Sequence, residues 1–490
     1  MNALGVATRL FQPLLLVAFT RLFGPAVMGI YLMVTSLAEM VASAFTAGTV
    51  DAMTVYGSQH VDDADRDAAA RDELERIFAT AFRFSVGGSV VVAVVAFVAA
   101  APLSRALLEG NPDATTAFRL AALSLPFAAL ATIASSAPYV RMQMQYGVGI
   151  MGLARPLVLL SAVLVARVVF QFPGAVALFV AALASYVVVA ALGLAAFARH
   201  FDARRTMSAS IRAPLHVSTL SLAVPQSIAL TLDRFMPRLG MLLLAAYGYP
   251  ASRVAFYGTA VLFATSVREL KLVFSSALVP VAARHHGAGD TRALEETLNR
   301  VTRLTLSLVV PVLLVALVTR NDVLSLVDRS YSGDTRFVAV LFAVPLIGAA
   351  LGFASDAVTI TGHGKWTLFN AAFQTASMLA LSSALIPRYG LLGASLGVAA
   401  ASLFTSIAAV LELRALERIS LRLRALRAPL LALAPPGLVV LFWGDPARGA
   451  DAPLRWLVAA LLASLYVGTL RVLSRRAEAD GALPDARRTE

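Results

Sequence analysis

The chain has 490 residues, of which 59% are hydrophobic and 14% are charged, and its mean hydropathy is +0.77. Soluble domains carry about 25% charged residues, so the composition excludes an ordinary soluble protein and indicates a polytopic membrane protein. Cysteine is absent, which excludes disulfides, thiolate metal sites and cysteine nucleophiles. The net charge of +12 is explained by arginine-rich cytoplasmic loops, so no nucleic-acid partner is expected.

Apolar segments long enough to cross a bilayer, which takes about 20 residues, recur along the chain. They predict an all-α polytopic protein with about fourteen transmembrane helices, centred near residues 14, 40, 90, 128, 158, 185, 230, 268, 310, 348, 375, 401, 435 and 463. The first segment has no separate cleavage motif, and we interpret it as the first span and not as a signal peptide.

A weak internal repeat divides these spans into two sets. LFGPAVMGIYLMVTSLAEM, near the start, and AYGYPASRVAFYGTAVLFATSVREL, over two hundred residues later, share a Gly and Pro hairpin, an aromatic motif and a long apolar helix. An even number of spans separates the copies, so a pseudo-twofold axis would run along the membrane normal. The predicted parts are a six-helix lobe (1–198), a basic cytoplasmic linker (199–216), a second six-helix lobe (217–414), two additional transmembrane helices (415–476) and a cytoplasmic tail (477–490).

Four blocks of the sequence carry a resemblance to a known group. They are TRLFGPAVMGIYLMVTSL; SLAVPQSIALTLDRFMPRLGMLLLAAYG, with Pro225 and Asp233; VFSSALVPVAARHHGAGDTRALEETLNR, with Pro280; and GHGKWTLFNAAFQTASMLALSSALIPRYGLLGASLG, with Asn370. In this order they resemble the multidrug/oligosaccharidyl-lipid/polysaccharide exporter superfamily, and within it the Wzx-like polysaccharide flippases. The charged set at 268–271 is denser than the family pattern.

The resemblance implies a two-lobed, alternating-access transporter of the bacterial cytoplasmic membrane. Its implied cargo is a polyprenyl-pyrophosphate-linked oligosaccharide, a polysaccharide or O-antigen precursor, moved from the inner to the outer leaflet. The expected partners are this lipid-linked oligosaccharide, the bilayer, and a polysaccharide polymerase or another assembly protein. Neither a cofactor nor a metal is expected, and no phosphate-binding loop or nucleophile–base set indicates an enzyme. The alternatives are a cation-coupled multidrug exporter, a peptidoglycan-precursor flippase and a non-transporting scaffold.

The predicted eighth helix carries Arg268, Glu269 and Lys271 near its midpoint, where charge is most costly. Arg268 and Lys271 are three residues apart and share a helix face, and two such cations suit a diphosphate. We therefore predict that both line a hydrated cavity and bind the pyrophosphate. The alternative is a buried ion-pair network in which Glu269 or Asp233 neutralises Arg268.

Other charged residues in or near the spans complete the candidate set. Arg234 and Arg238 lie four apart on the seventh helix around Pro237, and Arg141 and Arg155 flank the fourth and fifth spans; all four are candidate cargo-binding residues. The candidates for coupling or ion pairing are Glu269, Asp233, Glu39, Asp51 and Asp356. Glu39 is the first choice as a proton carrier, because apolar surroundings favour a protonated carboxyl group.

Arginine counts predict the orientation. With a cytoplasmic N-terminus, the loops and tail that fall inside carry about twice as many basic residues as those outside, which favours both termini inside. We therefore expect that Arg204→Cys and Arg422→Cys, in this cysteine-free chain, react with an impermeant thiol reagent after cell lysis and not in intact cells. Labelling of either position in intact cells would contradict the fourteen-span topology.

Overall fold

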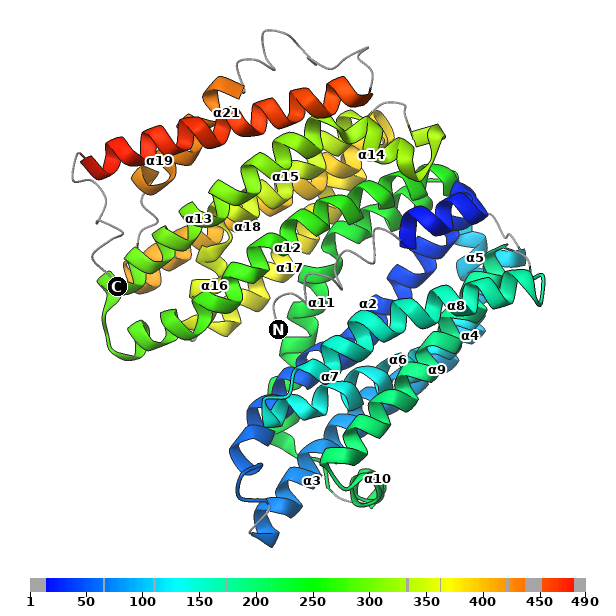
Figure 1. Ribbon diagram of the computed structural model, residues 1–490. Helices are drawn as coiled ribbons and strands as arrows, with labels where there is room; N and C mark the ends of the chain where they lie inside the picture. Colours follow the sequence, from blue (N-terminus) through cyan, green and yellow to red (C-terminus); the bar gives the residue numbers. More distant parts are fainter. Residues whose placement is uncertain are drawn as a thin grey trace. The chain divides into compact units, whose positions relative to one another are not determined.

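The computed structural model describes residues 15–64, 67–108, 112–172, 174–212, 214–331, 335–361, 363–419, 423–436 and 452–479. Within these ranges every regular element is helical (Figure 1), as predicted. Nine helices in the described ranges are long and apolar enough to cross a membrane, or ten if one bent pair forms a single span. The predicted centres from 40 to 401 all lie in helices, whereas the centre at 14 lies outside the described residues. The multi-pass prediction is confirmed, but the nine or ten helices found in the described ranges do not reproduce the count of fourteen exactly.

The chain divides into two compact units, Met1–Thr259 and Ala260–Glu490. Their boundary lies within α12 (Ala251–Gly287). The seventh predicted span, α11 (Val217–Ala246), packs along α2 (Pro25–His60) and so belongs to the first unit. The division into lobes at the linker 199–216 stays a prediction.

The first unit is a bundle in which α2 packs on α6 (Pro112–Ser136) and α11. In the same unit, α9 (Gly174–His200) packs on α6 and on α8 (Arg155–Val168). Small side chains permit the close approach of α6 and α9: a methyl group at Gly193 would lie 3.3 Å from the carbonyl oxygen of Ala131. The remaining elements of this unit are α3 (Ala68–Phe82), η1 (Arg83–Gly87), α4 (Gly88–Val98), α5 (Ala100–Leu108), η2 (Ala137–Arg141), α7 (Gln145–Gly147), η3 (Val148–Ala154) and α10 (Ala203–Arg212).

The second unit is built around the hairpin of α17 (Gly364–Tyr389) and α18 (Leu391–Glu417). In this unit α15 (Arg336–Leu351) packs on α18 and on α13 (Thr291–Val318). The hairpin turns at Gly390, whose φ of 57° suits glycine. Figure 1 shows α21 (Ala452–Ala479) running alongside α13 (Thr291–Val318), and the two helices pack together. The other elements are α14 (Arg320–Val327), η4 (Arg329–Tyr331), α15 (Arg336–Leu351), α16 (Phe353–Ile360) and α19 (Leu423–Ala432).

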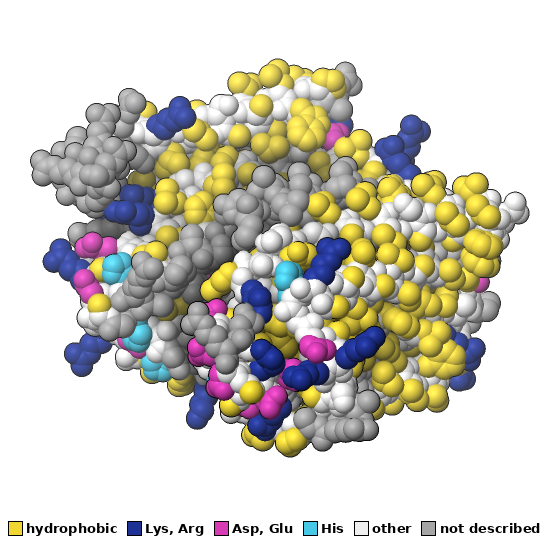
Figure 2. Space-filling view, turned by 60° about the horizontal axis from the view of Figure 1, so that its bottom comes forward, with side chains coloured by type: hydrophobic (Ala, Val, Ile, Leu, Met, Phe, Trp, Pro, Cys, Tyr) yellow, Lys and Arg dark blue, Asp and Glu magenta, His cyan; other side chains and the backbone are white. Residues whose placement is uncertain are grey.

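The surface has the character of a lipid-facing one. On α4 the exposed residues include Val91, Val94, Val95 and Val98, the last with 76% of its surface accessible. Such a row of valines suits hydrocarbon and not water. The end of the first unit that carries α3 and α10 comes forward in Figure 2, where charged side chains gather beside a broad hydrophobic surface.

The contact between α2 and α11 depends on Gly48. Its backbone N–H donates a hydrogen bond to Ser227 Oγ at 2.9 Å, and a methyl group on Gly48 would overlap the backbone of Ser227 and of Ala223. We expect Gly48→Ala to lower the free energy of unfolding by about 1–3 kcal/mol through overpacking, measured as loss of thermal stability in detergent. Gly468→Ala is the control, because nothing lies within 4 Å of its added methyl group. Equal stability of the two variants would contradict the close packing.

Candidate functional site

A cluster of three charged side chains joins three helices of the first unit. Glu39 lies in α2, Arg238 in α11 and Arg155 at the first position of α8. Arg238 Nη1 donates to Glu39 Oε2 at 2.6 Å, and Arg155 Nη2 lies 3.5 Å from Glu39 Oε1. Each carboxylate oxygen thus faces a different guanidinium group, and the three side chains together carry one excess positive charge.

The surroundings of Arg155 are aromatic and partly unsatisfied. Its guanidinium lies over the ring of Tyr186, 4.2 Å from the centroid, a cation–π contact that helps to hold a desolvated cation. The buried Nε of Arg155 has no hydrogen-bond partner among the described residues. A cavity of about 20 Å³ adjoins Glu39, Arg155 and Tyr186, enough for one water molecule. The cluster therefore retains donor capacity for an acceptor that is not part of the protein.

In the second unit, Lys271 of α12 pairs with Asp356 of α16. The ammonium Nζ lies 3.0 Å from Asp356 Oδ2 and 3.3 Å from Oδ1. It also donates to the carbonyl oxygen of Gly352 at 3.1 Å and lies 5.0 Å from the ring centroid of Phe353. This pair is locally neutral, in contrast to the cluster around Glu39.

The cluster around Glu39 and the Lys271–Asp356 pair consist largely of residues that the sequence analysis proposed as site residues. The cluster brings together Glu39, Arg155 and Arg238, and the pair brings together Lys271 and Asp356; all five were candidates from the sequence. In the structure, Glu39 and Asp356 each form ion pairs with basic side chains. Protonation of Glu39 would leave two guanidinium groups without this counter-charge, which weighs against Glu39 as a proton carrier.

The other candidates lie elsewhere or outside the described part. Arg141 is exposed, and its guanidinium lies 5.4 Å from the ring centroid of Phe201, so it contacts the end of α9. Asp51 is exposed on α2 and Arg268 is partly exposed on α12. The side chains of Asp233, Arg234 and Glu269 lie outside the described residues. Binding of cargo by Arg268, Lys271 or Arg234 stays a prediction.

Two residues that the sequence analysis did not single out form a further ion pair. Arg455 of α21 donates from Nε to Asp322 Oδ2 of α14 at 2.9 Å, with a second contact between Nη2 and Oδ1. This bidentate pair joins α21 to the rest of the second unit. Because 133 residues separate Arg455 from Asp322, the sequence offers no signal for the pair. The same holds for Tyr186, one aromatic residue within an apolar span.

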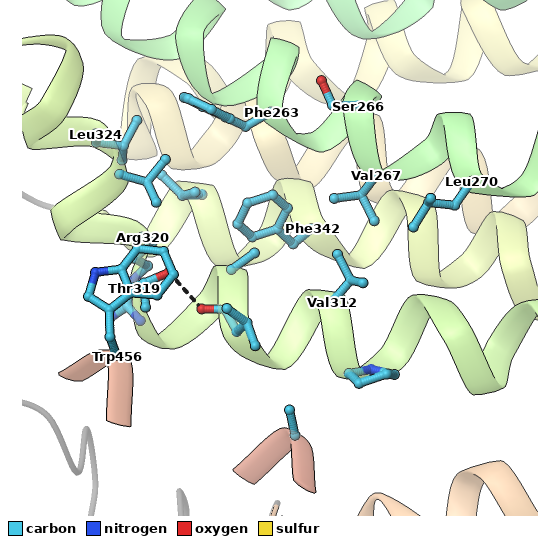
Figure 3. Close-up of a pocket in the computed structure, with 16 residues that line it drawn as sticks. Phe263, Ser266, Val267, Leu270, Val312, Thr319, Arg320, Leu324, Phe342 and Trp456 are labelled. Carbon is cyan, nitrogen blue, oxygen red and sulfur yellow. Dashed lines mark hydrogen bonds between the residues drawn. The ribbon is translucent and has the colours of Figure 1, made fainter. Parts of the chain in front are cut away.

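The second unit also contains an apolar pocket of about 630 Å³ (Figure 3). Phe263 and Val267 of α12, Phe342 of α15 and Trp456 of α21 lie around it, and Arg320 and Thr319 lie at the end where Trp456 is found. Along α13 the lining extends from Pro311 to Thr319, which corresponds to about 12 Å of helix. The space suits an elongated hydrocarbon group, with a polar end near Arg320.

The fold of this chain is similar to that of several transporters whose structures have been solved. A multidrug resistance transporter of the MATE family, of the MOP superfamily, in an inward-facing conformation, has a TM-score of 0.64 and 16% identity, over 84% of this chain and 98% of that one. The lipid II flippase MurJ, in an inward closed conformation, has a TM-score of 0.64 and 12% identity, over 94% of this chain and 99% of that one. The Vibrio cholerae MATE transporter VcmN has a TM-score of 0.60 and 17% identity, over 85% and 94%.

A search of curated proteins found none that matches the sequence. The family described as "Polysaccharide biosynthesis protein" matches residues 18–328, which is more than half of the chain. The chain therefore belongs to this polysaccharide biosynthesis family and has the fold of the MOP-superfamily transporters.

Proposed function

We propose that the protein is a flippase that moves a polyprenyl-pyrophosphate-linked oligosaccharide from the inner to the outer leaflet of a bacterial cytoplasmic membrane. The observation that carries the proposal is the excess positive charge of Arg155, Arg238 and Glu39, of which Glu39 and Arg155 lie in helices long and apolar enough to cross a membrane. Ionisable groups at such depth face a bundle interior or a watery cavity and mark substrate pathways. Membership of the polysaccharide biosynthesis family supports a glycan cargo.

A diphosphate matches the cluster chemically. A guanidinium group presents a planar fork of N–H donors that can hold two phosphate oxygens at once. Among the described residues the Nε–H of Arg155 has no acceptor, so a phosphate oxygen would gain a donor that Glu39 does not occupy once the cluster opens beyond the cavity of about 20 Å³ that adjoins it. The anion would also balance the one positive charge that remains in the sum of Glu39, Arg155 and Arg238.

The apolar pocket of the second unit supports the lipid part of the proposal. A polyprenyl chain needs a long hydrocarbon surface, and the lining from Pro311 to Thr319 provides one. The structural likeness to the lipid II flippase MurJ, which extends over 94% of this chain, is consistent with a lipid-linked cargo. A multidrug exporter for organic cations would need an uncompensated carboxylate, whereas Glu39 faces two arginines.

The cluster generates the first test. Arg155→Ala and Arg238→Ala should each lower glycan export about tenfold or more, because a charge-assisted hydrogen bond contributes about 1.5–3 kcal/mol. Arg238→Lys should be intermediate, since lysine keeps the charge and loses the fork. Export of lipid-linked glycan is measured in cells and divided by the amount of folded protein in the membrane.

Arg292→Ala is the matched control, because the Arg292 side chain is 84% exposed and its removal should leave export unchanged. If the two alanine variants in the cluster export normally per folded molecule, the cargo does not use these arginines. If their export falls only in proportion to lost protein, the cluster is structural and the proposed site is wrong.

The pocket generates the second test. Ala316→Phe and Ala463→Phe add bulk to two positions that line it and should reduce transport of a long-chain polyprenyl cargo several-fold. Ala460→Phe, on an exposed position of α21, is the control and should have no effect. Transport is followed in proteoliposomes as the accessibility of a fluorescent lipid-linked glycan. Normal transport by both pocket variants would exclude this pocket as the site of the chain.

A further inference from the structure

A sharp bend separates α15 from α16 at Gly352. The two helices are inclined by 47° across this break. Gly352 N–H still donates to Gly348 O at 3.0 Å, but Asp356 N lies 3.5 Å from Gly352 O, at the limit of a hydrogen bond. The carbonyl group of Gly352 therefore keeps only a long hydrogen bond within the helix.

No proline lies at the bend. Sharp kinks arise at proline, at Gly/Ser pairs, at π-bulges, or where a side chain or water enters the hydrogen-bond ladder. Proline would disturb the turn that precedes it, and Pro345 lies seven residues before Gly352, so its effect falls within α15 and not at the break. Gly352 lowers the cost of a bend at this position, and a side chain from another helix holds the bent turn.

That side chain is Lys271. Its ammonium donates to Gly352 O at 3.1 Å, and so adds a shorter hydrogen bond to the long one that the helix retains. The same nitrogen binds Asp356 in the first turn of α16 and lies against the ring of Phe353. The Lys271 side chain is only 14% exposed, and a buried lysine needs such compensation. All three contacts lie in or next to the first turn of α16.

The glycine at 352 fits this arrangement. A methyl group there would lie 3.0 Å from Lys271 Nζ and 2.5 Å from Gly348 O. The first distance shows that the ammonium lies close to where a side chain would begin. The second shows that the distorted backbone of this turn leaves no room for one.

We propose that Lys271 is a latch that holds the bend between α15 and α16, and that a phosphate group which draws its ammonium away releases the bend. The second clause rests on the proposed function, whereas the first does not. Arg268 lies one turn before Lys271, and side chains three apart have Cβ atoms about 5–6 Å from each other. A diphosphate bound at Arg268 would therefore lie within reach of the Lys271 ammonium and would compete with Asp356 for it.

Double electron–electron resonance tests the latch directly. Because the chain has no cysteine, spin labels can be attached at Ala339→Cys in α15 and Thr359→Cys in α16, both exposed. The labelled sites are 20 residues apart, about 30 Å in a straight helix, and removal of the bend lengthens this by about 2 Å. Lys271→Met should shift or broaden the distance distribution accordingly, whereas Lys271→Arg, which keeps a donor and the charge, should preserve it.

A second label pair tests whether the Lys271→Met variant remains folded. Ala372→Cys and Arg388→Cys, both exposed on α17, should give the same distance with and without the Lys271→Met substitution in the otherwise identical chain. Millimolar inorganic pyrophosphate should shift the α15–α16 distance of the protein that retains Lys271 toward that of the Lys271→Met variant, and sodium chloride of equal ionic strength should not.

The outcomes separate the two proposals. An unchanged α15–α16 distance in Lys271→Met, with the α17 distance intact, would refute the latch whatever the protein transports. A shift in Lys271→Met without any response to pyrophosphate would refute the release by phosphate. If the latch responds in both ways but cells lacking the protein export lipid-linked glycan normally, the proposed function fails and the latch stands.

Discussion

A charge largely buried among apolar helices needs an opposite charge nearby, and in the described part of both units such pairs join one helix to another. Removing one partner of a buried pair leaves an uncompensated charge at a cost of about 3–5 kcal/mol. Glu39 joins α2 to α8 and α11, Lys271 joins α12 to α16, and Asp322 joins α14 to α21. Hydrophobic contact alone cannot fix these neighbours, because lipid tails are as apolar as the helix surfaces.

The sequence predicted the helices far better than their partners. Length and apolar content decide whether a segment is a transmembrane helix, and both are local properties, so the predicted centres from 40 to 401 fall within the observed helices. Charge pairing is not local: Glu39 and Arg238 are 199 residues apart, and Lys271 and Asp356 are 85 apart. The sequence identified all four as unusual because of their depth, but their pairing needed the packed structure. Asp322 and Arg455 lie near helix ends, where a charge is ordinary, and so gave no signal.

The bend at Gly352 shows the same limit for backbone geometry. A proline indicates a kink in the sequence because it has no backbone N–H to donate within a helix, as at Pro237. Gly352 is one of 31 glycines, and nothing in GFASDAV distinguishes it. The amine that binds its carbonyl oxygen comes from α12, 81 residues away in the chain, so the proposed latch leaves no mark near Gly352 in the sequence.

The two charge arrangements differ in what an anion would do to them. Around Glu39 there is one positive charge in excess, so an anion can add to the cluster without displacing the carboxylate. Lys271 and Asp356 neutralise each other, so an anion that binds the ammonium competes with the Asp356 carboxylate for it. The first arrangement is therefore suited to retaining an anion, and the second to converting its arrival into a change of helix geometry. A transporter that alternates between states needs both properties, because binding shifts a conformational equilibrium only by the difference in affinity between the two states.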